Sequence, residues 1–172
     1  MNIIQSIWSC GKTNLQTHKA GWLSFEYNLM SVSLSCLQIN KFYDNIILYS
    51  DDAYAKVLID ILKLPYSEVK SELDCLNEYD EKLWALPKIY TYSKQTKPFL
   101  HIDCDIFIWE KFKDEFMQKE LLTQNIEIST EYYENIMKNL EENLCFFPNE
   151  IIELRKSEQR IYVYIVIEKC TT

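Results

Sequence analysis

The stretch FLHIDCDIFIW, residues 99–109, carries two aspartates, Asp103 and Asp105, inside a run of apolar side chains. The run begins after Pro98 and predicts a strand. Side chains of a strand alternate between its two faces, so both aspartates are expected on one side and Cys104 on the other, as a small buried residue. An unpaired buried carboxylate is costly, so this pair needs a partner that neutralises it.

Segments on both sides of this stretch alternate between strand-like and helix-like patterns. Short apolar runs predict strands, and apolar side chains at helical spacing, such as Trp22 with Phe25, predict helices. The expected strands are 3–8, 45–50, 67–70, 99–103, 121–128 and 160–168, and the expected helices are 21–40, 51–64, 87–95 and 130–143. This alternation predicts an α/β fold with a mainly parallel sheet flanked by helices.

Polar and aromatic residues follow three of these strands at their carboxyl ends. Trp8 ends the first strand, Asp51 and Asp52 follow the second, and the aspartate pair follows the strand after Pro98. Ligands of open α/β sheets bind where the carboxyl ends of parallel strands meet. We therefore expect these residues at one edge of the sheet, around one crevice.

Composition narrows the class of protein. The chain has 172 residues, of which 48% are hydrophobic and 14% aromatic, which is enough for the core of one domain. The net charge of −8 argues against binding to a nucleic-acid backbone. The six cysteines include no C-x-x-C pair, no secretory signal is visible, and no apolar run approaches the ~20 residues of a transmembrane segment. We expect a soluble, cytoplasmic protein with free thiols.

The two glycines, Gly11 and Gly21, are too few for a G-x-G-x-x-G dinucleotide loop or a P-loop. A divalent cation can stabilise two neighbouring carboxylates, since two carboxyl groups that lie so close cannot both ionise at low cost. Carboxylate oxygens suit Mg²⁺ or Mn²⁺, which usually keep few protein ligands and bind substrate phosphates as well. The pair at 103 and 105 therefore predicts a cation site that serves a phosphate-containing ligand.

The longer segment LWALPKIYTYSKQTKPFLHIDCDIFIWEKF, residues 83–112, places a helix with a basic residue before the D-x-D. It resembles the D-x-D region of GT-A glycosyltransferases, which transfer a sugar from a nucleotide-sugar donor. Over roughly residues 3–143 the pattern is similar to poorly characterised bacterial GT-A-like proteins. The resemblance implies a GT-A-like, Rossmann-like fold, a UDP- or GDP-sugar donor, a glycan or small-molecule acceptor, and Mn²⁺ or Mg²⁺.

The resemblance also assigns roles to single residues, which we state as expectations. Asp105 would coordinate the metal, and Asp103 would contact the metal or the ribose. Lys88 would meet the donor from its helix. The other implied contacts are Trp8 beside the base, Asp51 and Asp52 near the nucleoside, and Gln124 and Asn125 near a sugar.

Each assignment has a purely structural alternative. The aspartate pair can be a solvated strand end, and Asp51 with Asp52 forms a good helix start. Lys88 can be a solvated helix residue and Trp8 a core residue. His101 lies on the side of the aspartates, where we expect a packed histidine rather than a metal ligand.

Other functions remain open. A haloacid-dehalogenase-type phosphatase also uses D-x-D, but Phe107 stands where Thr or Val is usual, and a two-metal nuclease lacks further clustered acids. The main alternative is an inactive GT-A remnant or nucleotide-binding module, because no glycine follows Gly21. We expect residues 1–172 to form a single GT-A-like domain without the C-terminal acceptor half. The strand at 160–168 would then be a self-association edge.

Overall fold

The computed structural model describes residues 1–12, 14–119, 125–127, 131–143, 149, 153, 163–165 and 169–170. The chain divides into two compact units. The first unit comprises Met1–Leu122 and Ile167–Thr172, and the second comprises Thr123–Val166. The expectation of a single domain over residues 1–172 stays a prediction.

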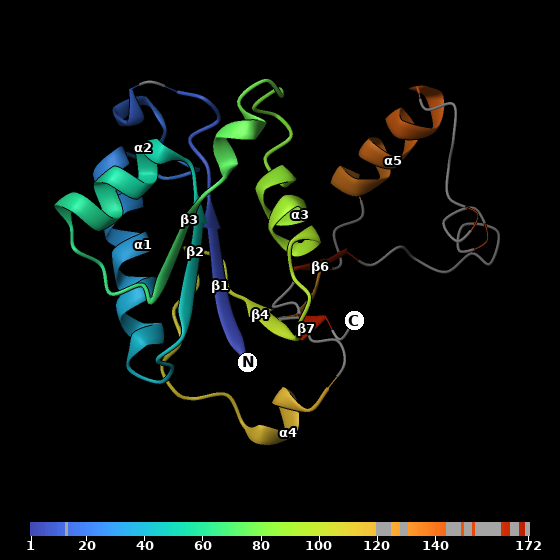
Figure 1. The fold of residues 1–172 in the computed structure, drawn as a ribbon. Helices are drawn as coiled ribbons and strands as arrows, with labels where there is room; N and C mark the ends of the chain where they lie inside the picture. Colours follow the sequence, from blue (N-terminus) through green and yellow to red (C-terminus); the bar gives the residue numbers. More distant parts are fainter. Residues whose placement is uncertain are drawn as a thin grey trace. The chain divides into compact units, whose positions relative to one another are not determined.

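The first unit is built on one sheet with the strand order β3-β2-β1-β4-β7 (Figure 1). The strands are β1 (Asn2–Ile7), β2 (Ile46–Ser50), β3 (Glu68–Ser71), β4 (Phe99–His101) and β7 (Lys169–Cys170). The first four are parallel to one another, and β7 is antiparallel to β4. The predicted α/β, Rossmann-like fold with a mainly parallel sheet is therefore confirmed. Because β1, β2 and β4 run in one direction, their carboxyl ends lie at one edge, as expected.

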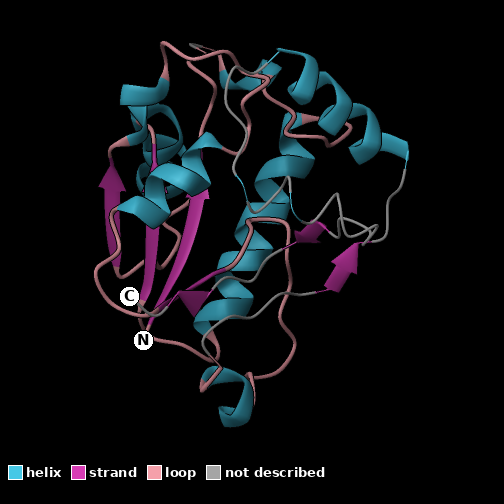
Figure 2. Cartoon of the chain, turned by 90° about the vertical axis from the view of Figure 1, so that its right-hand side faces the viewer, coloured by secondary structure: helices cyan, strands magenta, loops and turns pink. Residues whose placement is uncertain are grey.

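Helices cover both faces of this sheet (Figures 1 and 2). The helical elements of the first unit are η1 (Leu15–Thr17), α1 (Phe25–Asn40), α2 (Asp52–Ala55), η2 (Lys56–Ile61, a π-helix), η3 (Leu73–Leu76), α3 (Leu86–Ser93) and α4 (Asp114–Met117). In the second unit, α5 spans Glu131–Asn143, and β5 (Asn125–Glu127) pairs antiparallel with β6 (Val163–Ile165). Among the residues that the structure places, no helix is long and apolar enough to cross a bilayer.

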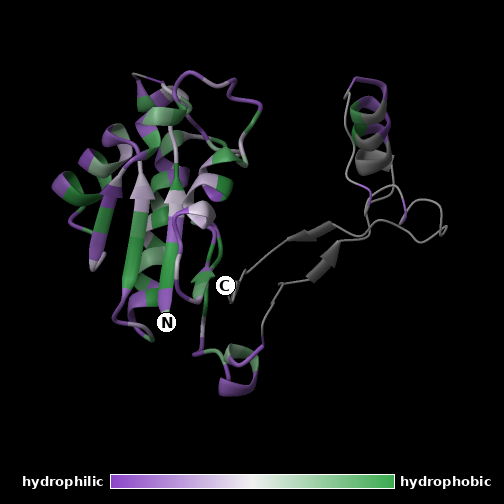
Figure 3. Ribbon diagram, turned by 45° about the vertical axis from the view of Figure 1, so that its right-hand side comes forward, coloured by the Kyte–Doolittle hydropathy of each residue, from purple (hydrophilic) through white to green (hydrophobic). Residues whose placement is uncertain are grey.

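The core follows from the alternation of side chains along β2. Ile47 and Tyr49 pack on the face covered by η3 and α3, and Leu48 packs on the face covered by α1, α2 and η2. All five residues of β2 are buried, whereas β3 at the edge has a single apolar residue, Val69, and no buried one. Figure 3 shows this contrast in the hydropathy of the two strands. The apolar layers fix the sheet and leave its carboxyl edge free to form a site.

Several expected boundaries differ by a few residues, and two of these differences affect the site. The helix expected from residue 21 begins at Phe25, because the side chain of Ser24 accepts a hydrogen bond from the Tyr27 N–H and caps it. The strand expected over 99–103 ends at His101. After one more ladder bond, from the Ile102 N–H to the Ile4 carbonyl, the chain turns. Residues 121–124, 128, 160–162 and 166–168 of the other expected strands lie outside the described residues.

Because β4 ends at His101, the two aspartates lie beyond the strand. Asp103 and Asp105 do not share one face of a strand. They flank a turn that is closed by a hydrogen bond of 3.0 Å from the Ile106 N–H to the Asp103 carbonyl. Between them the Cys104 thiol points to the Ser6 carbonyl and packs against the core cluster under α1. Cys104 is therefore packed against the core but only partly buried, and the strand geometry behind the prediction of a buried residue was wrong.

Candidate functional site

A cavity of about 430 Å³ lies at the carboxyl edge of the sheet. It is formed by the end of β1, the loop before α1, the first turn of α3 and the turn after β4. Its lining residues are Ser6, Ile7, Trp8, His18, Ala20, Gly21, Trp22, Asn28, Trp84, Pro87, Lys88, Asp103, Cys104 and Asp105. The volume lies within the range of pockets for small molecules, about 300–1,000 Å³.

Lys88 and Asp103 form an ion pair on the wall of this cavity. The Lys88 Nζ lies 2.7 Å from the Asp103 Oδ2, and both side chains are largely buried. Pro87 lies in the first turn of α3, where its missing N–H costs no helical hydrogen bond, and Lys88 follows it in the same turn. The Lys88 ammonium also lies 5.5 Å from the centre of the Trp84 ring, within cation–π range. Among the described residues that line the cavity, Lys88 is the only lysine or arginine, and it is held against a carboxylate.

His101 lies next to this pair, inside the core and outside the cavity lining. Its Nε2 lies 2.9 Å from the Ser6 Oγ, and its Nδ1 lies 3.6 Å from the Asp103 Oδ1, which is too long for a hydrogen bond. Burial and, second, the charge of Lys88 lower the pKa of His101 to about 3. His101 is fully buried and neutral near pH 7, which is the packed histidine that the sequence led us to expect.

The turn that carries the aspartates is held from inside the core by two polar residues. The Gln5 Nε2 donates to the Ser35 Oγ (2.9 Å) and to the Asp103 carbonyl (3.4 Å). The Ser35 Oγ in turn donates to the Ile106 carbonyl at 2.6 Å. Both side chains are fully buried. A satisfied buried network of this kind fixes the position of the turn, and with it the two carboxylates.

The chemistry of the two carboxylates fits a cation only in part. Burial, and then the negative charge of Asp103, raise the pKa of Asp105, so a positive charge in the cavity would favour its ionised form. No group of three or more His, Cys, Asp or Glu side chains with metal-binding geometry occurs among the described residues. A Mg²⁺ or Mn²⁺ ion at Asp103 and Asp105 would have to take its other ligands from a substrate and water, and the predicted cation site stays a prediction.

The other predicted site residues divide between the cavity and its surroundings. Trp8 lines the cavity, but it is buried and its Nε1–H donates to the Asn77 Oδ1 at 2.8 Å. Asp51 is also buried, and its carboxylate accepts from the Ser9 N–H (2.6 Å) and the Tyr54 N–H (2.9 Å). It thus caps α2, which is the structural alternative considered above.

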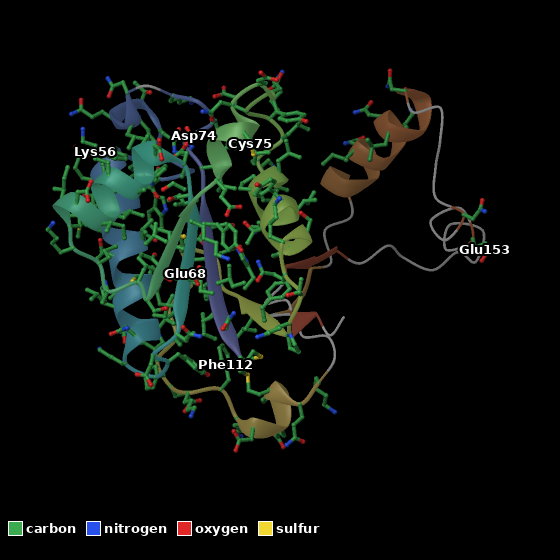
Figure 4. All side chains as sticks on the ribbon, viewed as in Figure 1. Lys56, Glu68, Asp74, Cys75, Phe112 and Glu153 are labelled. Atoms are coloured by element: carbon green, nitrogen blue, oxygen red, sulfur yellow. The ribbon has the colours of Figure 1, made fainter. Side chains whose placement is uncertain are left out.

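Asp52 is exposed, and its backbone N–H donates to the Asp74 carboxylate at 2.8 Å. Figure 4 labels Asp74, which lies at the same end of the sheet as α2. Neither Asp51 nor Asp52 belongs to the cavity lining, and their predicted contacts with a nucleoside stay predictions. Gln124 lies outside the described residues, and Asn125 belongs to β5 in the second unit.

Sequence reasoning missed the side of the cavity that is formed before α1. His18 lies on this side, and its Nδ1 is 2.8 Å from the Tyr54 hydroxyl, which also accepts from the Asn28 Nδ2 at 2.7 Å. Its Nε2 is 3.8 Å from the Cys10 Sγ. Burial lowers the pKa of His18, so its ring is neutral near pH 7. This loop has no periodic pattern, and no signal in the sequence pointed to it.

Trp22 was expected on the apolar side of a helix and instead lines the cavity, because the helix begins three residues later. Its ring and that of Trp84 are both partly exposed. Flat apolar faces next to charged groups suit ligands that combine a ring system with phosphates or hydroxyls.

Comparisons with known proteins give a family and no activity. No curated protein and no solved structure matches the chain. A family model described as "Family of unknown function (DUF6734)" matches residues 1–166. Since this match covers most of the chain, the protein belongs to the DUF6734 family.

Proposed function

We propose that the protein binds a nucleotide-sugar donor in the cavity at the carboxyl edge of the sheet and acts as a metal-dependent glycosyltransferase. The observation that carries the proposal is the grouping of Lys88, Asp103 and Asp105 on one cavity wall, with tryptophan rings beside them. A cation and a lysine are the two kinds of positive charge that a diphosphate requires. Lys88 on this wall is the lysine, and the carboxylates of Asp103 and Asp105 would bind the cation.

In this proposal each charged residue has a defined task. The carboxylates of Asp103 and Asp105 hold Mg²⁺ or Mn²⁺, and the Lys88 ammonium binds a phosphate oxygen. When bound, the metal neutralises the charge that builds up on the diphosphate leaving group. Trp22 and Trp84 offer faces on which the base or the sugar can stack.

The ion pair between Lys88 and Asp103 links these tasks. The Lys88 ammonium, 2.7 Å away, already balances the negative charge of Asp103. Asp103 can coordinate a cation only when Lys88 moves away to pair with another anion. A phosphate group of the donor would be that anion. Metal and nucleotide are therefore expected to strengthen each other's binding, which is a reciprocal coupling.

Calorimetry on the full chain tests the proposal. UDP and GDP are titrated with Mn²⁺, with Mg²⁺ and without metal. We expect binding that is stronger with metal, and a loss of this metal effect in Asp105→Asn. Asp60→Asn is the matched control, because Asp60 is an exposed aspartate on η2 outside the cavity. Absence of nucleotide binding, or an equal metal effect in both variants, would contradict the proposal.

A second candidate is a nucleotide-binding module that does not catalyse transfer. The Lys88–Asp103 ion pair favours it, because the pair balances the charge of Asp103 with no metal present. An assay for release of UDP or GDP from the corresponding nucleotide sugars separates the two candidates. Metal-dependent release supports the transferase, and binding without release supports the module.

A further inference from the structure

The outer face of α1 is apolar, although it faces away from the sheet. The helix has 16 residues and one charged side chain, Glu26. Apart from Glu26, its exposed positions carry large apolar side chains, and Leu23 extends the series before the cap. These residues, called the α1 stripe below, are Leu23, Tyr27, Met30, Leu34 and Leu37. A helix that is apolar on both its inner and its outer face is typical of a buried helix.

The spacing of the α1 stripe places its members on one side of the helix. The steps between them are four, three, four and three residues, which is the repeat of helices that pack against another helix. The opposite side carries Val32, Cys36 and Ile39, which are buried against the sheet. Figure 1 shows α1 as the outermost layer on its face of the sheet, beside α2. The stripe is therefore not needed for the core of the first unit.

The area of the stripe is sufficient for a small specific interface. Leu23 is 85% exposed and Met30 64%, and the other three residues are between 40% and 52% exposed. Together they expose roughly 500 Å² on one copy, so a symmetric contact would bury roughly 1,000 Å², the lower size of a specific interface. Singly scattered apolar side chains need no explanation, but a continuous patch of this size does.

The charge of the molecule favours a second copy of this chain as the occupant. The chain carries a net charge of −8, so most of its surface repels another copy. The α1 stripe has no charged member, and two copies that meet there bring few like charges together. We propose that the protein forms a two-fold symmetric dimer through the α1 stripe. This proposal does not depend on the function proposed for the cavity.

The stripe is also complementary to itself in an antiparallel arrangement. When Met30 of one copy lies opposite Met30 of the other, the same two-fold axis places Leu23 opposite Leu37, and Tyr27 lies within one residue of the position opposite Leu34. An isologous interface requires this pairing, in which residue i contacts residue j and j contacts i. In the antiparallel arrangement the N-terminus of each helix lies beside the C-terminus of the other, so the two helix dipoles attract each other.

The mass of the full chain in solution tests the proposal. Analytical ultracentrifugation over a range of concentrations should give a species of twice 20.6 kDa for the wild type. Met30→Glu should weaken dimerisation by at least about tenfold, because it places two glutamates together at the axis. Ile89→Glu is the control, since Ile89 is 60% exposed on α3 at the other face of the sheet and should leave the dimer intact.

Disulfide trapping gives a second, independent measurement. Met30→Cys should link to its own copy under mild oxidation on a non-reducing gel, above the background of the wild type and of Ile89→Cys. A monomeric wild type at all concentrations overturns the proposal. This includes the case in which Met30→Glu lowers the melting temperature of a monomer, which would show that another part of the same chain covers the stripe. Equal effects of the glutamates at 30 and 89 also overturn it.

Discussion

Replacing His101 with glutamine should change how the stability of the protein depends on pH. His101 is fully buried, with its Nε2 2.9 Å from the Ser6 Oγ. The groups around its ring are the carboxylate of Asp103, the ammonium of Lys88 and the edge of Tyr92. Burial is the main cause that lowers its pKa to about 3. A glutamine can still bond to Ser6, but it does not titrate.

The size of the effect follows from the two pKa values of this residue. In the unfolded chain the pKa of a histidine is about 6.5, so between pH 6.5 and pH 3 the unfolded state binds one more proton than the folded state. The free energy of unfolding of the wild type then falls with decreasing pH, by about 1.4 kcal/mol per pH unit. The stability that the neutral His101 contributes is fully present above pH 6.5 and is lost progressively as the pH falls towards 3. From pH 7 to pH 5 the contribution of His101 is about 2 kcal/mol.

Urea denaturation of the wild type and of His101→Gln at pH 7, 6 and 5 measures this contribution. The wild type should lose about 2 kcal/mol more than the variant over this range. His18→Gln is the control, because the chain has only two histidines and His18 is only partly buried, so its variant should differ less. A difference between wild type and His101→Gln that stays constant from pH 7 to pH 5 would refute a neutral, buried His101. So would an NMR titration in which the His101 ring protonates near pH 6.5.

Three further measurements test other parts of the site. Lys88→Met should lower the free energy of unfolding by about 1 kcal/mol, because it leaves a partly buried carboxylate unpaired, and should weaken UDP or GDP binding in calorimetry. Asp51→Ala should cost about 1–3 kcal/mol in denaturant titration, whereas Asp52→Ala, next to it but exposed, should cost much less. In mass spectrometry after iodoacetamide, exposed Cys75 should react well before Cys104, because burial raises the pKa of the Cys104 thiol; equal rates would contradict this packing.

The order of elements could be predicted from the sequence because each strand of the parallel sheet is a short apolar run. Residues 46–50 are buried on both faces of the sheet and are apolar except for their last position. Flanking helices then followed from the alternation of patterns. Boundaries were less predictable, because they depend on single hydrogen bonds. The cap at Ser24, for example, moved Trp22 from a helix to the cavity wall.

Acidic residues at strand ends show what the sequence can and cannot resolve about the site. Asp51 and Asp103 both follow parallel strands, and the same argument predicted both at one edge of the sheet. The Asp51 carboxylate accepts from two backbone N–H groups, whereas that of Asp103 faces a cavity and an ammonium. The difference lies in which donors surround each carboxylate, and no single-sequence pattern encodes that.

The turn of the aspartates was mispredicted for a related reason. Apolar periodicity extends past residue 101, and only buried polar partners show why the strand stops there. Gln5 and Ser35 come from β1 and α1, far away in the sequence, and they bind the carbonyls of Asp103 and Ile106. The Tyr66 hydroxyl donates to the Gln5 Oε1 at 2.9 Å, so the polar atoms of this glutamine are satisfied within the core. Local pattern and tertiary structure disagree at this point, and such disagreements concentrate at functional sites. The buried network therefore supports the same assignment as the ion pair, since both position the carboxylates at the cavity rather than in the sheet.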